Sequence, residues 1–240
     1  MGLDAFLHGI VEATRDLVCC YKPNLAFFEA LGMPGQIALR NLLGSLPPEV
    51  PVLVDAKRGD TPQTMRAYAR AIFHELGADA VTVNPYLGGD SVGPFFDYAD
   101  RGVFVLCKTS NPGAGEIQDL VVEGGERLFL NVARRALTWD RHGTLGLVVG
   151  ATYPSDVAAV RSIAPNVPIL LPGVGAQGGD LERSVQAALD ADGGGAIVNA
   201  SRSVLYASRG NDWQAAARAE AVSVRAAINA ARASAATSTR

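Results

Sequence analysis

The stretch PVLVDAKRGDT, residues 51–61, runs from an apolar segment directly into a cluster of charges. Its first part, Val52-Leu53-Val54, is apolar and rich in β-branched residues, which predicts a buried strand. Gly59 then allows a turn, and Pro62 suits the first position of a helix. Four charged residues lie between this strand and this helix: Asp55, Lys57, Arg58 and Asp60. Because charges at the mouth of a core are costly unless they pair or take part in chemistry, this strand end is a candidate active site.

The same order of strand, polar turn and helix recurs along the chain. Seven apolar runs predict strands, and each is followed by a segment of helical periodicity: 17–22, 51–57, 79–85, 102–110, 145–152, 167–173 and 195–201. This alternation, with nearly continuous apolar strands, indicates a parallel sheet covered by helices. We expect an α/β protein of the (β/α)8 TIM-barrel class, with one domain over residues 1–232 and a disordered tail at 233–240.

Seven strands are one fewer than a closed barrel of this class contains. The chain opens with a helical pattern at 5–15, and no apolar run precedes it. Either the barrel lacks its first strand, or the true start lies upstream of Met1, or the fold is an open doubly wound sheet. We favour the barrel without its first strand, because no GxGxxG motif follows the first predicted strand.

The composition argues against several classes of protein. Of the 240 residues, 48% are hydrophobic and 19% are charged, with a net charge of −3, so we expect neither nucleic-acid binding nor disorder. No apolar run has the length of a membrane span, and the segment MGLDAFLHGI lacks the basic region of a signal peptide, which predicts a cytoplasmic protein. Cys19, Cys20 and Cys107 lie in strand-like runs without metal-binding spacing, so we expect buried thiols and no metal site.

Lysine is used at only three positions, each at the end of a predicted strand: Lys22, Lys57 and Lys108. Unlike arginine, lysine can give away its proton, so the pattern suggests a catalytic ammonium, although chance among few residues is an alternative. Asp55 and Lys57 are two apart on a strand and therefore leave the same face. They form either a structural ion pair or part of a catalytic site. Asp60 and Thr61 could equally serve only as caps of the helix that Pro62 begins.

Two loops near the end of the chain could hold a phosphate group. PGVGAQGGD, residues 172–180, is rich in glycine, and Asp180 could cap the following helix. NASRSVLY, residues 199–206, places Arg202 at the start of another helix. The loops after the last two strands form the usual phosphate site of these barrels, although turn geometry explains the glycines equally well.

Six motifs together carry a family resemblance. They are DAKRGD (55–60), KPN with FFEALG (22–32), VTVNPYLG (81–88), KTSNPGA (108–114), VVGATYP (148–154) and PGVGAQGGD (172–180). In this order, over about Ile10 to Ala207, they resemble the orotidine 5′-phosphate decarboxylases, most closely the longer bacterial branch. The resemblance implies cofactor-free decarboxylation of orotidine 5′-monophosphate to UMP, the last step of pyrimidine biosynthesis, by a homodimer.

The resemblance also implies roles for the reacting groups. Lys57 corresponds to the acid that delivers a proton to C6, and Asp55 to the carboxylate near the carboxylate of the substrate. Lys22 corresponds to the lysine that contacts the ribose hydroxyls and orders the charges. This agrees with the chemistry, because loss of CO2 leaves an anion on a carbon without an electron sink, which a nearby cation can stabilise and protonate.

Further residues are implied to bind the substrate or to act between subunits. Asp60 and Thr61 correspond to the pair that reaches across the dimer interface into the neighbouring site. Ser110 corresponds to the residue that reads the pyrimidine edge, and Gln177 and Arg202 correspond to the phosphate-binding positions. One departure is the aspartate that ends the first strand of the family, because that strand is missing here.

Three other functions are alternatives to this one. A magnesium-dependent sugar-phosphate decarboxylase of the same superfamily would have an acid in place of Lys22. A Schiff-base aldolase needs a neutral amine, whereas Asp55 favours the charged form of Lys57. A non-catalytic nucleotide-binding protein is favoured only by the missing strand, and would not need Lys57.

Overall fold

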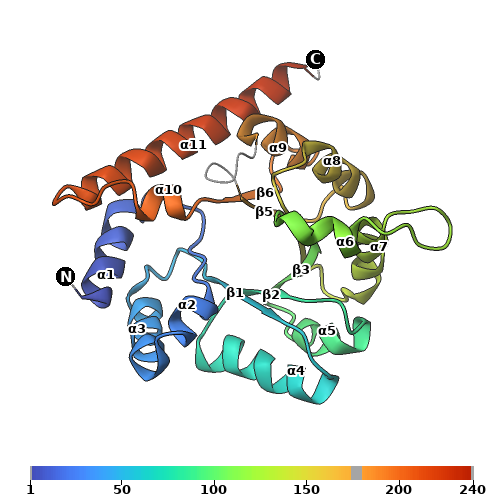
Figure 1. Ribbon diagram of the computed structural model, residues 1–240, viewed down its shortest axis with the longest axis horizontal. Helices are drawn as coiled ribbons and strands as arrows, with labels where there is room; N and C mark the ends of the chain where they lie inside the picture. The colour runs from blue at the N-terminus through green and yellow to red at the C-terminus, as the bar shows by residue number, and fades with distance from the viewer. Residues whose placement is uncertain (1, 174–179, 239–240) are drawn as a thin grey trace.

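The computed structural model describes residues 2–173 and 180–238. Its centre is a curled sheet of six parallel strands in the order of the sequence. Helices surround this sheet on its outside (Figure 1). The strands are β1 (Leu53–Arg58), β2 (Ala80–Val83), β3 (Gly102–Lys108), β4 (Leu145–Val149), β5 (Ile169–Pro172) and β6 (Ala196–Asn199).

The helices alternate with the strands, as the sequence predicts. The first half of the chain contains α1 (Leu3–Thr14), α2 (Leu25–Glu29), α3 (Gly32–Ser45), α4 (Pro62–Ala69) with its π-helical continuation η1 (Arg70–Glu75), and α5 (Gly89–Phe96). The second half contains the short 3-10 helix η2 (Pro112–Ala114), α6 (Gly115–Gln118), α7 (Leu128–Trp139), α8 (Pro154–Ile163), α9 (Leu181–Ala188), α10 (Arg202–Leu205) and α11 (Trp213–Ser238). Helix α11 thus continues through most of the segment expected to be a disordered tail.

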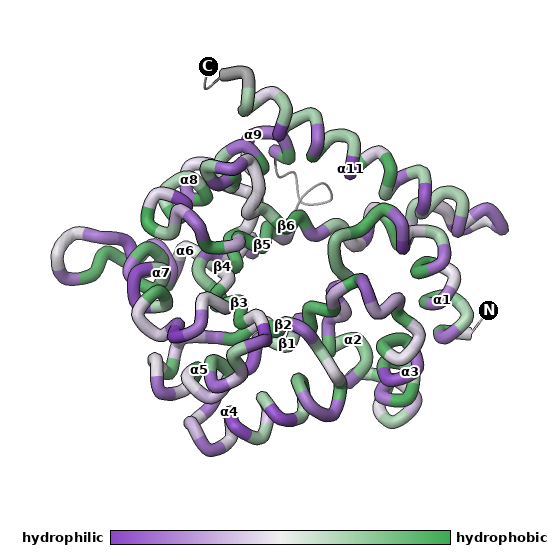
Figure 2. The backbone as a smooth tube through the Cα atoms, turned by 180° about the vertical axis from the view of Figure 1, so that it is seen from behind, coloured by the Kyte–Doolittle hydropathy of each residue, from purple (hydrophilic) through white to green (hydrophobic). Residues whose placement is uncertain are grey.

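The sheet buries both of its faces. Its outer face packs on the helices in one large apolar cluster that includes Val54, Val105 and Leu171. The alternate residues point inward and form a second, small cluster: Leu53, Phe104, Val148 and Leu170. Figure 2 shows the corresponding apolar colouring of the central strands. A packed interior and a packed exterior are the features of a (β/α) barrel, so the predicted fold class is confirmed.

The predicted first strand, 17–22, is not a continuous strand. Instead, two isolated parallel bridges join this part of the chain to β1, between Tyr21 and Val52 and between Asn24 and Asp55. Three backbone hydrogen bonds of 2.9–3.0 Å support them, among them the one that Asp55 N donates to Pro23 O. Proline at position 23 cannot donate to a ladder, which limits the pairing here. Lys22 is nevertheless held beside β1.

The sheet has an open edge at β6. Among the described residues, β6 pairs only with β5, and all four of its residues are half-buried, whereas those of β4 are fully buried. A barrel strand without a neighbour on one side loses cover in this way. This agrees with the predicted absence of the strand that would lie between β6 and the segment at 21–24.

Helix α11 connects the two ends of the chain. It packs on α1 and on α9, along one side of the ring (Figure 1). The ring of Trp213 lies 5.2 Å from that of Phe6, and Gly9 leaves room for this indole, which a Cβ atom would meet at 2.2 Å. Arg218 binds both carboxylate oxygens of Asp16 at 2.6 and 2.7 Å. In the described part of the chain, no helix is long and apolar enough to span a membrane.

Candidate active site

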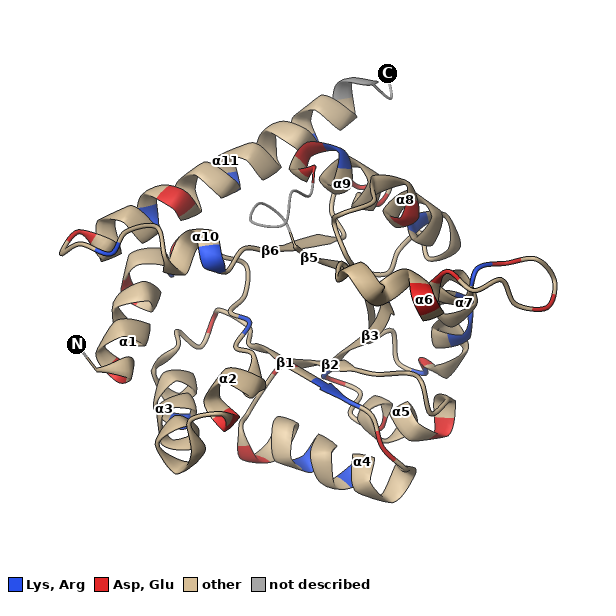
Figure 3. Cartoon of the chain, viewed as in Figure 1, with Lys and Arg blue, Asp and Glu red and all other residues tan. Residues whose placement is uncertain are grey.

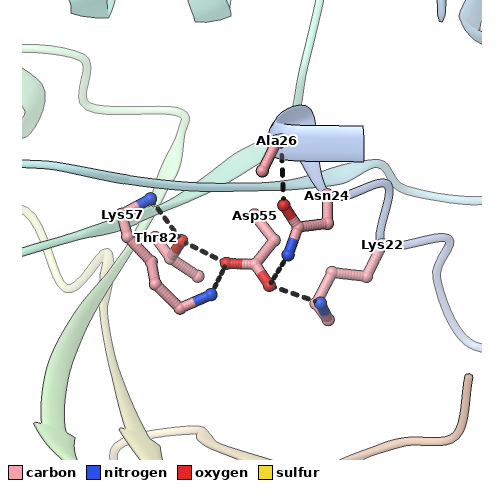
Figure 4. A network of polar contacts seen from close by, with 6 residues as sticks. All are labelled: Lys22, Asn24, Ala26, Asp55, Lys57 and Thr82. Carbon is pink, nitrogen blue, oxygen red and sulfur yellow. Dashed lines mark hydrogen bonds and ion pairs between the residues drawn. The ribbon is translucent and has the colours of Figure 1, made fainter. Parts of the chain in front are cut away.

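Two lysines and one aspartate meet at the carboxyl end of β1 (Figure 4). Lys22 Nζ lies 2.7 Å from Asp55 Oδ2, and Lys57 Nζ lies 2.5 Å from Asp55 Oδ1. The Asp55 and Lys22 side chains are only 9% and 11% exposed, whereas Lys57 is 46% exposed. Of the two ammonium groups, that of Lys57 is therefore the one open to a bound molecule.

Two neutral side chains complete the contacts of Asp55. Thr82 Oγ1 on β2 donates to Asp55 Oδ1 at 2.9 Å and accepts the backbone N–H of Lys57 at 3.0 Å. Asn24 Nδ2 donates to Asp55 Oδ2 at 3.4 Å, while its Oδ1 caps α2 by accepting from Ala26 N. Neither Thr82 nor Asn24 was predicted as a site residue. Thr82 could have been found as the polar residue in the apolar run AVTV.

The backbone of Lys57 has an unusual conformation. Its φ angle is +47°, and it is the only residue other than glycine with positive φ among those the structure describes. The pairing of β1 with β2 is interrupted here, between Val54 and Arg58, which indicates a bulge. A side chain in the left-handed region costs roughly 1–2 kcal/mol, and such strain is concentrated at functional sites.

The charges around Asp55 lower its pKa. Burial alone would raise the pKa of this carboxyl group, but the charge of Lys22 and the hydrogen bonds from Lys22 and Lys57 outweigh it. The resulting pKa lies below the ordinary value of 3.8. Asp55 is therefore an anion at neutral pH, fixed between two cations before any substrate binds. Figure 3 shows that most other charges lie on the outer helices and loops.

Among the described residues, Asp60 and Thr61 make no hydrogen bond or ion pair with this group of charges. The Asp60 carboxylate accepts from Thr61 N at 2.6 Å, and in the described part of the chain it makes no ion pair. Pro62 begins α4 as predicted, with Thr61 at the N-cap, but neither side chain caps the helix. The cap prediction is therefore wrong for the side chains, because Asp60 binds its own neighbour instead. By contrast, Asp180 caps α9 as predicted, accepting from Arg183 N at 3.0 Å.

Two of the predicted substrate-binding residues, Ser110 and Arg202, lie at the same end of the barrel. Ser110 follows β3, and Arg202 is an exposed residue at the start of α10, directly after β6. Parallel strands bring their carboxyl ends to one side of the sheet, which is where barrel enzymes bind their substrates. Gln177 lies outside the described residues.

The cysteine predictions are only partly correct. Cys107 is buried, but Cys19 is exposed and Cys20 is half-buried, because residues 17–20 lie outside the sheet. Within residues 2–173 and 180–238, no group of three or more His, Cys, Asp or Glu side chains could hold a metal ion.

Most of the chain matches the model of one protein family. The model described as "Orotidine 5'-phosphate decarboxylase / HUMPS family" matches residues 2–219. The chain belongs to this family. A relative named orotidine 5′-phosphate decarboxylase, from Roseiflexus sp., is 53% identical over 231 residues, which cover 96% of this chain and 85% of the relative.

Further members of the orotidine 5′-phosphate decarboxylase family support this result. A relative of the same name from Thermomicrobium roseum is 54% identical over 226 residues, covering 93% of this chain and 80% of the relative. The solved structure of an OMP decarboxylase from Leishmania donovani is 42% identical and superposes with a TM-score of 0.84, covering 94% of this chain and 87% of that one. The resemblance inferred from the six sequence motifs is thus confirmed.

Proposed function

We propose that this protein decarboxylates orotidine 5′-monophosphate to UMP and CO2, the reaction for which its relatives are named, and that it does so without a cofactor. The observation that carries the proposal is the placement of Asp55 between Lys22 and Lys57 at the carboxyl end of β1. Such an arrangement fixes charge before the reaction begins, which is the main way in which enzymes stabilise charged transition states.

The reaction needs one cation that acts twice. When the bond between C6 and the carboxylate breaks, CO2 leaves and the electron pair stays on C6. The exposed ammonium of Lys57 stabilises this carbanion and then transfers a proton to it, and water restores the proton on Lys57. Asp55 cannot move away, because Lys22, Thr82 and Lys57 hold its two oxygens. A substrate carboxylate placed beside it is repelled, and its loss relieves this repulsion.

The phosphate group of the substrate supplies binding energy at a distance from C6. Arg202, exposed at the start of α10, can pair with a phosphate, and the glycine-rich loop with Gln177 follows the neighbouring strand. Energy from such a remote contact can be used to align the ring with Lys57. Lys22, which pairs with Asp55, is assigned to the ribose hydroxyls, and Ser110 to the pyrimidine edge.

The homodimer belongs to the same proposal. Asp60 has no cationic partner among the described residues, so a neighbouring subunit could use it and Thr61. Apolar side chains are exposed on elements next to this segment: Phe27 on α2 is 75% exposed, Tyr86 after β2 is 81% exposed, and Leu31, Met33 and Ile37 are also exposed. The end of α2 is tied to this segment, because Glu29 pairs with Arg58. Gly59 packs on Asn84, whose side chain accepts from Tyr86 N, so this surface adjoins Asp60. Exposed apolar patches of this kind mark protein interfaces.

The direct test is the loss of the absorbance of orotidine 5′-monophosphate when purified protein is added in the presence of EDTA. Rapid loss, with UMP as the product, supports the proposal. No loss, with UMP still bound, would instead favour a nucleotide-binding protein. A strict requirement for magnesium would favour a sugar-phosphate decarboxylase, although none of the relatives described above carries such a name. The cytoplasmic location remains a prediction.

A further inference from the structure

An ion pair and two hydrogen bonds join the two ends of the loop after β3. Lys108, the last residue of β3, binds Asp119 Oδ1 with its Nζ at 2.6 Å. The next residue, Thr109, accepts a hydrogen bond from Gln118 Nε2 at 2.8 Å and donates its N–H to Gln118 Oε1 at 2.9 Å. Residues 108 and 109 thus hold residues 118 and 119, which closes the segment between them into a compact loop.

The ion pair in this closure is costly for stability alone. The Lys108 side chain is 3% exposed and Asp119 is 39% exposed. Lys108 Nζ lies 5.3 Å from the centre of the Phe129 ring, and Arg127 lies 3.7 Å from the same oxygen of Asp119. A buried ammonium rarely regains its desolvation energy from one carboxylate, and an apolar residue of similar size is often at least as stable. This cost suggests that the ion pair is present because it fixes the position of the loop.

The residue that the closed loop positions is Ser110. It follows Thr109 directly, and its backbone lies against Gly150, where a Cβ atom would meet Ser110 N at 2.9 Å. Gly150 N also donates to Lys108 O at 2.8 Å. Ser110 is thus confined between the end of β4 on one side and the fastened loop on the other.

We propose that Lys108 and Asp119 are positioning residues that hold Ser110 in place for the substrate. This rests on the proposed function, in which Ser110 reads the pyrimidine edge. Lys108 itself acts through the loop and does not touch the reacting atoms. The lysine at the end of β3 thereby has a role different from those of Lys22 and Lys57.

The test is a mutant cycle with Lys108→Met and Ser110→Ala. Methionine keeps an apolar stem against Phe129 and removes only the charge. We expect Lys108→Met to lower kcat/KM for orotidine 5′-monophosphate about 10- to 100-fold, as a misplaced contact does. In the Ser110→Ala background, the same change should have almost no further effect. Independent losses that multiply would overturn the proposal, as would full activity of Lys108→Met.

Arg101→Met is the matched control. Arg101 precedes β3 at its opposite end and binds Asp79 at 3.1 Å, so this variant also removes an ion pair next to β3, away from the loop. It should keep kcat/KM within about twofold and show no coupling to Ser110→Ala. A loss equal to that of Lys108→Met would mean that any damage to β3 lowers activity, and would overturn the proposal.

Amide hydrogen exchange separates this proposal from the proposed function. In Lys108→Met, the amide hydrogens of residues 109–119 should exchange faster than in the wild type, whereas the exchange rates in α7 should be unchanged. If the wild-type protein is inactive on orotidine 5′-monophosphate, the proposed function fails, and exchange alone decides the positioning role. Unchanged exchange in 109–119 would overturn it even in an active enzyme.

Discussion

Lys22 and Lys57 donate to different oxygen atoms of one carboxylate, that of Asp55. The two lysines come from segments that are far apart in the sequence, and one anion holds both. Three ionic groups with a net positive charge therefore face the carboxyl end of the barrel. A substrate with anionic groups neutralises this net positive charge. This explains how so many charges are tolerated at the mouth of an apolar core.

Removal of the Lys57 side chain should abolish turnover, whereas UMP should still bind to the substrate site. We expect Lys57→Ala to lower kcat by at least about 10³-fold, because the carbanion loses both its counter-charge and its proton donor. Lys57→Arg should be nearly as inactive, since arginine keeps the charge but does not give up its proton. Activity is measured by absorbance and UMP binding by calorimetry. Turnover of Lys57→Ala close to that of the wild type would contradict the assignment of Lys57 as the proton donor.

Asp55→Asn should destabilise the fold in a pH-dependent way. Because the pKa of Asp55 is lowered in the folded protein, its contribution is fully present above its ordinary pKa and is lost as the pH falls through the lowered value. At pH 7 we expect a loss of about 3 kcal/mol in the free energy of unfolding, since two cations lose their partner. Urea unfolding should show this difference shrinking below about pH 4. The exposed Asp97→Asn serves as the control, and a pH-independent difference for Asp55→Asn would contradict the prediction.

The hydroxyl of Thr82 should matter more than its size. Thr82→Val keeps the shape but leaves Lys57 N–H without its acceptor and takes a donor from Asp55, so we expect a loss of about 1–3 kcal/mol in stability together with lower kcat. Thr82→Ser retains the hydroxyl and should stay close to wild type in both respects. The comparison requires urea unfolding and steady-state kinetics. Equal behaviour of the valine and serine variants would show that the hydroxyl is not needed.

The positive φ of Lys57 should be visible in stability. Lys57→Gly is expected to be more stable than Lys57→Ala by about 0.5–1 kcal/mol, because glycine adopts φ of +47° without strain. At the neighbouring residue the order should reverse: Ala56→Gly should be less stable than wild type. Denaturant unfolding of the four proteins decides this. An alanine at position 57 that is as stable as glycine would show that the bulge carries no strain.

Mixed subunits should recover activity if Asp60 acts across a dimer interface. Lys57→Ala and Asp60→Asn are each expected to be inactive, but their co-expression should restore about a quarter of the sites, because half of the dimers are mixed and each of these has one complete site. Co-expression of Lys57→Ala with Asp55→Asn is the control, since both residues belong to the same subunit's site. A mixture as inactive as its parents would mean that Asp60 acts within its own chain.

The charged part of the site was predictable from the sequence because of strand geometry. Asp55 and Lys57 share one strand end, and a lysine at each of two other strand ends is expected on the same side of a parallel sheet. The conformation that joins them was not predictable. Strand alternation predicts that Asp55 and Lys57 leave the same face of a regular strand. In the structure, the strand is instead interrupted by a bulge with positive φ at Lys57, and this bulge depends on the pairing of β1 with β2.

The uncharged contacts were harder to foresee. Thr82 looks like an ordinary β-branched strand residue, and its role arises only from the register that sets β2 beside β1. Asn24 both caps α2 and reaches Asp55, so its capping role hides the second one. The apolar character of the segment at 17–22 predicts a strand, but Pro23 and the two isolated bridges limit its pairing to a short edge.

The packing of α11 on α1 sets the order in which the chain can complete its fold during synthesis. Contacts such as Arg218 with Asp16 join residues 202 positions apart, and the helix that makes them is synthesised after all the strands of the described sheet. Until then α1 lacks its cover, although β1 to β6 already exist in the nascent chain. Because contacts between distant residues form slowly, α1 stays open to chaperones and proteases until α11 has been synthesised.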